Sequence, residues 1–281
     1  MNNLLEIKNL YLEAYYEEKW QPIVHDISFD LKRGEVLGLI GESGAGKSTI
    51  GLAAMGYARQ GCRIASGSIN LDGIEMFNAS NKDLRKVRGS KISYVAQSAA
   101  ASFNPAHRVI KQYAEAPVQH GLMSSVQAEK EAIELYERLF LPSPDKIGYR
   151  YPHELSGGQL QRAMVAMAMS CKPDIIVFDE PTTALDVTTQ IEVLAAVKEI
   201  TEKMNKAALY ITHDLAVVAQ VAHRIMVLRN GRLVEMNETR ELIKNPKEKY
   251  TRELLNVRSL RENKTIHDKM DVILNIKNVA A

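Results

Sequence analysis

One stretch decides the fold of this chain: Gly41-Glu42-Ser43-Gly44-Ala45-Gly46-Lys47-Ser48. It follows the short apolar run 36–40, which indicates a buried strand, and it leads into residues 48–58, which suit a helix. Its glycines let backbone N–H groups converge on phosphate oxygens, and the helix adds the positive end of its dipole. The stretch therefore predicts a strand, a phosphate-binding loop and a helix.

Two side chains of this loop carry distinct chemistry. Lys47 can reach the β- and γ-phosphates of a nucleotide as a point charge, and the Ser48 hydroxyl is placed to hold Mg²⁺. A flexible turn is the alternative, and the flanking strand and helix disfavour it. The residues that we expect to contact nucleotide are Gly41, Glu42, Ser43, Gly44, Ala45, Gly46, Lys47, Ser48 and Thr49.

A pair of carboxylates ends a second buried strand. Asp179 and Glu180 follow four apolar residues, so both lie at the carboxyl end of that strand, where open parallel sheets hold their ligands. We expect Asp179 to hold Mg²⁺ through water and Glu180 to act as the general base for an attacking water. A solvated strand end is the alternative for the pair alone, but a phosphate loop in the same chain favours the site.

The order of the elements predicts an α/β fold. A further apolar run at 208–212 follows a helical stretch at 188–203, and strands that alternate with helices form a mostly parallel sheet with crossovers. Residues 99–169 are mostly helical, with breaks at prolines, and this insertion is a candidate subdomain. Residues 66–73 indicate a strand that is closed by an Asp-Gly turn.

Bulk composition excludes several classes of protein. The formal net charge is +2, so nothing pulls the chain strongly toward nucleic acid or anionic lipid. Two cysteines, Cys62 and Cys171, are too few for a disulfide framework and fit a reducing compartment. The first residues lack the profile of a signal peptide, and no apolar run approaches the roughly 18 residues of a spanning helix. A role at a membrane would therefore require partner subunits.

A signature stretch, Leu155-Ser156-Gly157-Gly158-Gln159, lies between the phosphate loop and the acidic strand. Together with Ala184-Leu185-Asp186, with Gln97 after the run 92–95 and with His213 after the run 208–212, it resembles the ATP-binding subunits of ATP-binding cassette (ABC) transporters. The resemblance covers about residues 4–256. It implies a P-loop NTPase core with an N-terminal antiparallel β subdomain and an α-helical subdomain, about 99–169, that carries the signature.

The resemblance also assigns roles to these residues. Gln97 is the family's Q-loop glutamine and a metal contact with Ser48 and Asp179, and His213 is the switch histidine that senses the γ-phosphate and orients the water. The cofactors that the resemblance implies are ATP and Mg²⁺. The catalytic set expected from the residues and the resemblance together is Glu180, His213 and Gln97.

Pairing of two such domains is a further implication. Ser156, Gly157 and Gly158 would contact the γ-phosphate that a second ABC domain binds, through exposed backbone donors and the start of the following helix. The second domain could be another copy, a different chain or a fused tandem copy.

The family position for an aromatic that stacks on adenine falls on Ala14, so Tyr15 or Tyr16 serves, or neither; Tyr16 is placed in the expected set.

Flanking segments resemble the peptide and nickel importer branch of the family. These segments are 151–154, 180–188, 245–247 and 250–255. The branch implies an ATPase that powers uptake of peptides or related small solutes. Its partners would be two transmembrane permeases and a periplasmic or extracellular solute-binding protein, and it would act peripherally at the cytoplasmic face of the plasma membrane.

Two features of the sequence depart from the branch pattern. Glu248-Lys249 stand where the branch has His-Pro, and 98–101 lengthen the loop after Gln97.

The alternative function is a soluble ABC ATPase in nucleic-acid or ribosome processing, but no zinc or coiled-coil insertion or basic patch is visible, so we expect no nucleic-acid partner. A plain P-loop kinase leaves the signature unexplained.

The last residues echo the first ones. Leu274-Asn275-Ile276-Lys277-Asn278-Val279 repeats the pattern of residues 5–10. We expect one ABC domain over residues 1–257, then a linker at 258–281 that contains the possible start, near Val272, of a second ABC domain. Coincidence in a short apolar and basic strand is the alternative.

Overall fold

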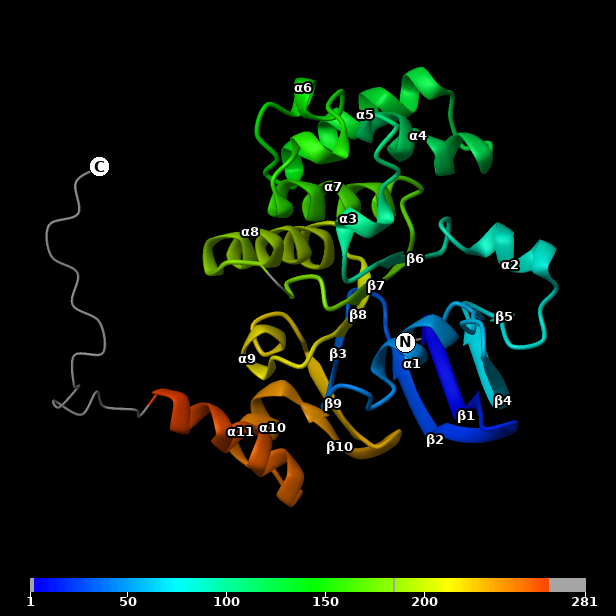
Figure 1. Cartoon of the computed structure of the whole chain (residues 1–281), viewed down its shortest axis with the longest axis vertical. Helices are drawn as coiled ribbons and strands as arrows, with labels where there is room; N and C mark the ends of the chain where they lie inside the picture. The colour runs from blue at the N-terminus through cyan, green and yellow to red at the C-terminus, as the bar shows by residue number, and fades with distance from the viewer. Residues whose placement is uncertain (1–2, 184, 263–281) are drawn as a thin grey trace, which may run out of the picture.

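The computed structural model describes residues 3–183 and 185–262, which form two sheets and a set of helices (Figure 1). The larger sheet has six strands in the order β10-β9-β3-β8-β7-β6, all parallel except β10, which runs antiparallel to β9. This result confirms the predicted mostly parallel sheet. The strands are β3 (Val36–Ile40), β6 (Ile92–Val95), β7 (Ile175–Asp179), β8 (Ala207–Ile211), β9 (Arg224–Arg229) and β10 (Arg232–Glu238).

The smaller sheet is antiparallel, with the order β2-β1-β4-β5. The turn between its first two strands lies at Glu17 and Glu18, both with positive φ, and the predicted Asp-Gly turn lies at Asp72 and Gly73, again with positive φ. This sheet is the expected N-terminal antiparallel subdomain. Its strands are β1 (Leu5–Tyr16), β2 (Lys19–Leu31), β4 (Cys62–Leu71) and β5 (Ile74–Glu75).

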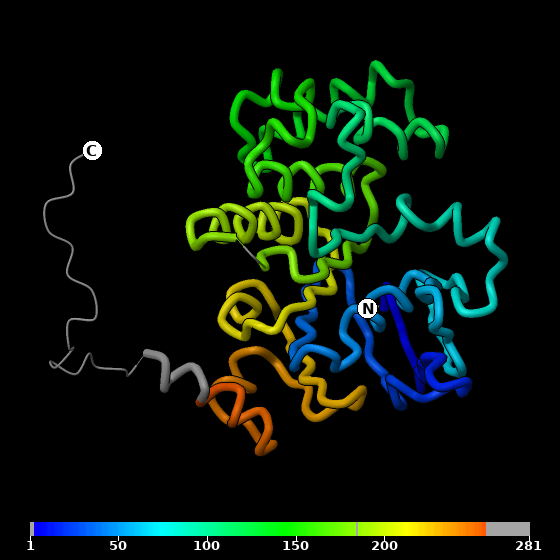
Figure 2. The backbone as a smooth tube through the Cα atoms, viewed as in Figure 1, coloured from blue at the N-terminus to red at the C-terminus, as the bar shows by residue number. Residues whose placement is uncertain are grey.

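The helical subdomain interrupts the larger sheet between two neighbouring strands. The chain leaves β6, passes through the helices drawn in green and returns through α7 to β7 (Figure 2). The observed helices agree with the predicted helical stretch at 99–169. They are α3 (Ala99–Ser102), α4 (Val109–Gln119), α5 (Ser125–Arg138), α6 (Pro144–Ile147) and α7 (Gly157–Met169), with a 3₁₀ turn at Pro152–Glu154.

The other helices cover the sheets and close the chain. One prediction was too long: the helix after the phosphate loop ends at Ala53 rather than Ala58, and Gly56, with φ +63°, lies in the turn that follows. The predicted helix 188–203 is an α-helix followed by a π-helical turn at Glu199–Lys203. These helices are α1 (Lys47–Ala53), α2 (Asn81–Val87), α8 (Val187–Lys198), α9 (Leu215–Val218), α10 (Thr239–Lys244) and α11 (Lys249–Glu262).

The C-terminal prediction is only partly covered by the structure. Helix α11 continues to Glu262, past Val257, where the sequence analysis ends the domain. The echoing segment 274–279 lies outside the described residues. Across residues 3–183 and 185–262, no helix combines the length and the apolar character that crossing a membrane requires.

Two apolar cores lie on opposite faces of the parallel sheet. Successive side chains of a strand point to opposite faces, and β7 follows this rule: Ile176 and Phe178 join the core beneath the helical subdomain, while Ile175 and Val177 join the core beneath the antiparallel sheet and α1. Every residue of β3, β7 and β8 is buried, as expected for strands covered on both sides. This burial fixes the positions of the strand ends.

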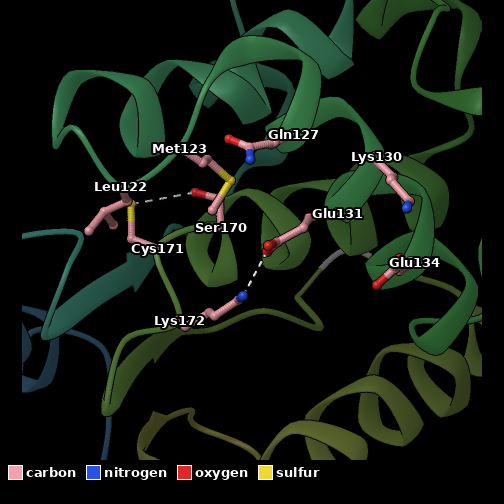
Figure 3. Close-up of a pocket in the computed structure, with 9 residues that line it drawn as sticks. All are labelled: Leu122, Met123, Gln127, Lys130, Glu131, Glu134, Ser170, Cys171 and Lys172. Atoms are coloured by element: carbon pink, nitrogen blue, oxygen red, sulfur yellow. Dashed lines mark hydrogen bonds and ion pairs between the residues drawn. The ribbon is translucent and has the colours of Figure 1, made fainter.

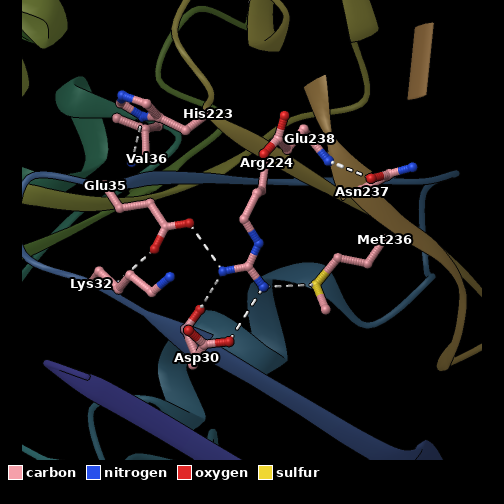
Figure 4. Close-up of polar contacts among 9 residues, drawn as sticks. All are labelled: Asp30, Lys32, Glu35, Val36, His223, Arg224, Met236, Asn237 and Glu238. Atoms are coloured by element: carbon pink, nitrogen blue, oxygen red, sulfur yellow. Dashed lines mark hydrogen bonds and ion pairs between the residues drawn. The ribbon is translucent and has the colours of Figure 1, made fainter. Parts of the chain in front are cut away.

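An arginine ties the two sheets together beside these cores. Arg224 of β9 donates to Glu35 (3.0 Å) just before β3 and to Asp30 (3.3 Å) on β2, as Figure 4 shows. Burial alone would lower the pKa of Arg224, but Glu35 and Asp30 together raise it. The guanidinium group therefore stays charged and spans the junction of the antiparallel and parallel sheets.

Replacement of Arg224 by Met should destabilise the domain by about 2 kcal/mol, because Glu35 would keep a largely buried charge without its cation. The side chain of Glu35 is only 10% exposed. Arg33→Met is the matched control: Arg33 and Asp174 are 52% and 26% exposed, and an exposed pair of this kind contributes less than about 1 kcal/mol. Urea unfolding followed by circular dichroism measures both variants, and equal losses of stability would contradict the account.

Candidate active site

The expected phosphate-loop, catalytic and metal-binding residues lie where four parallel strands end. The phosphate loop follows β3, Gln97 follows β6, Asp179 ends β7 with Glu180 directly after it, and His213 follows β8. Because these strands are parallel neighbours in the order β3-β8-β7-β6, their carboxyl ends share one edge of the sheet. Segments that are far apart in sequence are thus brought together, such as Ser48 and Asp179, which are separated by 131 positions.

Two glycines let the phosphate loop pass close to other backbone segments. Gly41 has φ +154°, and a Cβ there would lie 2.2 Å from the Leu228 carbonyl oxygen. Gly46 has φ +90°, and a Cβ there would lie 2.8 Å from a methyl group of Val24 on β2. Any larger residue would clash or strain the backbone at these positions. The loop is therefore held between β9 and β2, with its amide groups at the start of α1.

Lys47 is buried at the base of this loop. Its Nζ donates to the carbonyl oxygens of Gly41 (2.8 Å) and Glu42 (2.9 Å), and the residue is 5% exposed. Burial lowers the pKa of Lys47, an effect that the nearby charges of Glu180 and Asp179 oppose. Phosphate oxygens at Nζ would add negative charge and favour the ammonium form.

Asp179 connects three elements through its carboxylate. Its Oδ1 accepts a hydrogen bond from the Ser48 hydroxyl on α1 (2.8 Å), and its Oδ2 accepts one from the Tyr94 hydroxyl on β6. Asp179 is 4% exposed, so both donors contact a carboxylate that water hardly reaches. The arrangement joins the phosphate-loop helix to the acidic end of β7.

Glu180 lies where the ends of three strands meet. Its Oε2 accepts from the Gln97 amide (3.1 Å) and from the Thr183 hydroxyl (2.9 Å), while its Oε1 lies 3.3 Å from His213 Nδ1. Its φ of +49° is uncommon for a non-glycine residue, and such conformations cluster at functional sites. The structure therefore brings together all three residues of the expected catalytic set.

The signature segment begins α7. The Ser156 hydroxyl accepts from the Gln159 N–H (3.3 Å), and the Gln159 side chain accepts from the Ser156 N–H (3.1 Å), which together form a capping box. Ser156 and Gly157 are exposed, whereas Gly158 is buried against Thr189 of α8. In the described part of the chain, no hydrogen bond or ion pair links these three residues to the phosphate loop.

The two candidate tyrosines for adenine lie on different faces of β1. Tyr16 alternates with Ala14 and Leu12, and Leu12 pairs with Val24, the β2 residue that borders the phosphate loop. Tyr15 points to the opposite face, where its ring lies 5.3 Å from the ring of Trp20. Tyr16 is 62% exposed. The strand geometry thus favours Tyr16 over Tyr15.

A hollow in the helical subdomain lies apart from this site. It has a volume of about 480 Å³ and lies between α5 and the turn after α7, where Lys172 pairs with Glu131 at 2.9 Å (Figure 3). Cys171 contributes to its wall. None of the residues that line it belongs to the expected nucleotide-binding or catalytic sets.

Sequence reasoning missed two residues that contact the acidic pair. Tyr94 lies on β6, three residues before Gln97, and contacts Asp179. Thr183 lies three residues after Glu180 and contacts it. A hydroxyl at the carboxyl end of a strand that neighbours the acidic strand was the available signal for Tyr94. Nothing in the local sequence shows that its side chain points toward Asp179, because that depends on the pairing of β6 with β7.

Comparison with known proteins agrees with this arrangement. Residues 24–183, more than half of the chain, match the family of ABC transporters. The chain belongs to the ABC transporter family. It is 40% identical over 271 residues to the oligopeptide transport ATP-binding protein OppD of Lactococcus lactis subsp. cremoris, covering 96% of this chain and 80% of that protein.

Two further relatives widen the comparison. The oligopeptide transport ATP-binding protein AppD of Bacillus subtilis is 39% identical, with 91% of this chain and 78% of that protein covered. The metal-staphylopine import system ATP-binding protein CntD of Staphylococcus aureus is also 39% identical, with 91% and 93% covered. The predicted kinship with the peptide and nickel importer branch is confirmed.

A solved structure supports the fold of this ABC protein. The ATP-binding cassette MJ0796, solved as a dimer in a post-hydrolysis state with ADP and phosphate, has a TM-score of 0.75 and 26% identity. The alignment covers 84% of this chain and 98% of that one. The predicted fold class and the prediction of an ATP-hydrolysing subunit are confirmed, and the chain is an ABC ATPase that uses nucleotide.

The two signature glycines should respond differently to alanine. At Gly158 a Cβ would lie 2.2 Å from a methyl group of Thr189, whose hydroxyl donates to Asp186 at 2.8 Å, so Gly158→Ala should cost about 1–3 kcal/mol of stability through overpacking. At Gly157 the nearest atom would be 3.7 Å away, so Gly157→Ala should fold with the parent's stability. Thermal unfolding of both variants checks this, and equal melting temperatures would contradict it.

Proposed function

We propose that this chain is the ATP-hydrolysing subunit of an importer for peptides or related small solutes, and that it acts at the cytoplasmic face of the plasma membrane. One observation carries the hydrolytic assignment: the Glu180 carboxylate, directly after Asp179, meets Gln97 and His213 at the edge where the phosphate loop begins. The names of the relatives support the cargo class, since OppD and AppD are oligopeptide transport proteins.

The proposed binding of ATP starts at the phosphate loop. The backbone amides of 41–49 and the start of α1 would surround the phosphates, and Lys47 Nζ would turn from the Gly41 and Glu42 carbonyls to the β- and γ-phosphate oxygens. Tyr16 would stack on adenine, on the face of β1 that it shares with Leu12. These contacts hold the γ-phosphate beside the end of β7.

The proposed chemistry uses the cluster around Glu180. As general base, Glu180 would accept the proton of the water that attacks the γ-phosphate. His213 would orient that water and sense the γ-phosphate, and Gln97 would leave its hydrogen bond to Glu180 to contact the bound nucleotide. Thr183 and His213 would still hold the Glu180 carboxylate after Gln97 leaves, so the base would keep its position on binding.

The residues present fit a magnesium ion. Ser48, Asp179 and Gln97 offer a hydroxyl, a carboxylate and an amide oxygen, which are hard oxygen donors of the kind that Mg²⁺ prefers alongside phosphate oxygens. When bound, the ion would neutralise developing charge on the phosphates. The direct contact between Ser48 and Asp179 supports the fit, because it places these two groups on the same side of the loop.

A second ABC domain would complete the site. Ser156 and Gly157 are exposed at the start of α7, and the cap through Gln159 leaves the first backbone amides of that helix directed outward. We propose that Ser156, Gly157 and Gly158 meet the γ-phosphate bound by a partner domain. The partner is a second copy, a related chain or a fused tandem copy, and residues 1–257 form the unit that pairs.

The proposed permease contact lies after Gln97. The extra residues 98–101 supply the Ser98 cap and the first three residues of α3 (Ala99–Ser102), which packs against α7. A movement of Gln97 on nucleotide binding could thus reach the signature helix through α3, and Gln161 of α7 adds a contact to the Ala96 carbonyl (3.5 Å). Two permeases would dock here, and a solute-binding protein outside the membrane would deliver cargo to them.

Glu180→Gln should bind ATP with the parent's affinity and lose hydrolysis by at least about 100-fold, the range expected when a positioned general base is removed. Fluorescent ATP binding and phosphate release measure the two properties on the purified chain. Glu137→Gln, an exposed position on α5, is the control and should hydrolyse ATP normally. Hydrolysis by Glu180→Gln at the parent's rate would contradict the catalytic assignment.

The same variants test the importer in cells. In a host strain that lacks this gene, the parent and Glu137→Gln should restore uptake of a radiolabelled oligopeptide, whereas Glu180→Gln should not, because hydrolysis powers the transport cycle. Oligopeptide uptake in the deletion strain equal to that of the intact strain would argue against peptide cargo. ATP hydrolysis by the purified chain would still stand in that case.

A further inference from the structure

Tyr94 contacts the acidic end of β7 although no motif includes it. Its hydroxyl donates to Asp179 Oδ2, while the Ser48 hydroxyl donates to the other carboxylate oxygen, Oδ1, at 2.8 Å. The two donors come from β6 and α1, which both contact the strand that carries Asp179. Asp179 therefore has one oxygen on the side of the phosphate loop and one on the side of β6.

The position of the Tyr94 hydroxyl is fixed by packing. Its ring packs against the core beneath the antiparallel sheet, and its backbone pairs with Val177 of β7, two residues before Asp179. A phenol carries its proton at neutral pH, so the Tyr94 hydroxyl is the donor to the Asp179 carboxylate. A donor that is held in place by packing therefore faces the carboxylate.

For Asp179 to contact a metal ion, one of its two carboxylate oxygens must face Ser48 and the phosphate loop. The terminal torsion of aspartate is broad, so an unrestrained group could turn either oxygen toward Ser48. With Oδ2 held by Tyr94, Oδ1 is the oxygen left facing Ser48 and the phosphate loop. Outer partners that orient a ligating carboxylate typically contribute 10–100-fold to metal affinity.

We propose that Tyr94 is a positioning residue for the nucleotide-bound metal ion: its hydroxyl holds Asp179 so that Oδ1 faces the ion beside Ser48. This inference rests on the proposed magnesium site. The proposal gives β6 itself a role in metal binding, in addition to the role of Gln97, which follows this strand. It also accounts for a polar donor at a strand position that packs against an apolar core.

Tyr94→Phe tests the role, because it removes only the hydroxyl and keeps the ring. With saturating ADP, electron paramagnetic resonance of free Mn²⁺ should show about tenfold weaker Mn²⁺ binding to the variant than to the parent. The affinity for a fluorescent ADP analogue in EDTA should stay within about twofold, since the phosphate loop is intact. Tyr11→Phe, on the outer face of β1, is the control and should match the parent in both measurements.

Four results would overturn the proposal. Unchanged Mn²⁺ affinity in Tyr94→Phe would show that the hydroxyl does not position the carboxylate. An equal loss of metal-free ADP binding, or a lower melting temperature that accounts for the change, would show a structural role instead. Absence of Mn²⁺ binding in the parent with ADP would contradict the proposed metal site itself, and the role of Tyr94 with it.

Discussion

The site depends on one constraint: parallel strands deliver their carboxyl ends to a single edge of the sheet. Four of the strands carry a functional segment at that end, and the complete burial of β3, β7 and β8 leaves their ends little freedom to move. Short polar contacts then join segments that are remote in sequence, such as Ser48 with Asp179 and Gln97 with Glu180. The chemistry is thus positioned by the packing of the two cores rather than by any local motif.

The chain divides its functional groups between two surfaces. The phosphate loop and the acidic pair face one another within the chain, while Ser156 and Gly157 are exposed at the start of α7. The second signature glycine has a different role within the chain, because Gly158 lets α7 approach Thr189 of α8. The signature is therefore both a packing element of its own domain and, as we propose, a phosphate contact for another.

Much of this arrangement could be predicted from sequence, because the phosphate loop and the signature act through backbone geometry that glycine spacing reveals. The central strands were also evident, as their short apolar runs allow few alternatives. The length of α1 was overestimated, since apolar residues continue past Ala53 into the turn at Gly56. Tyr94 and Thr183 were invisible, because their contacts depend on strand pairing and on the unusual backbone of Glu180.

The central claim is that triphosphate joins two of these domains, each completing the site of the other. Light scattering on the Glu180→Gln variant during size-exclusion chromatography tests this claim most directly, since the variant should hold ATP without consuming it. The account predicts a mass near 31.4 kDa without nucleotide and about twice that mass in saturating Mg²⁺ and ATP. A monomer mass under saturating nucleotide would contradict it.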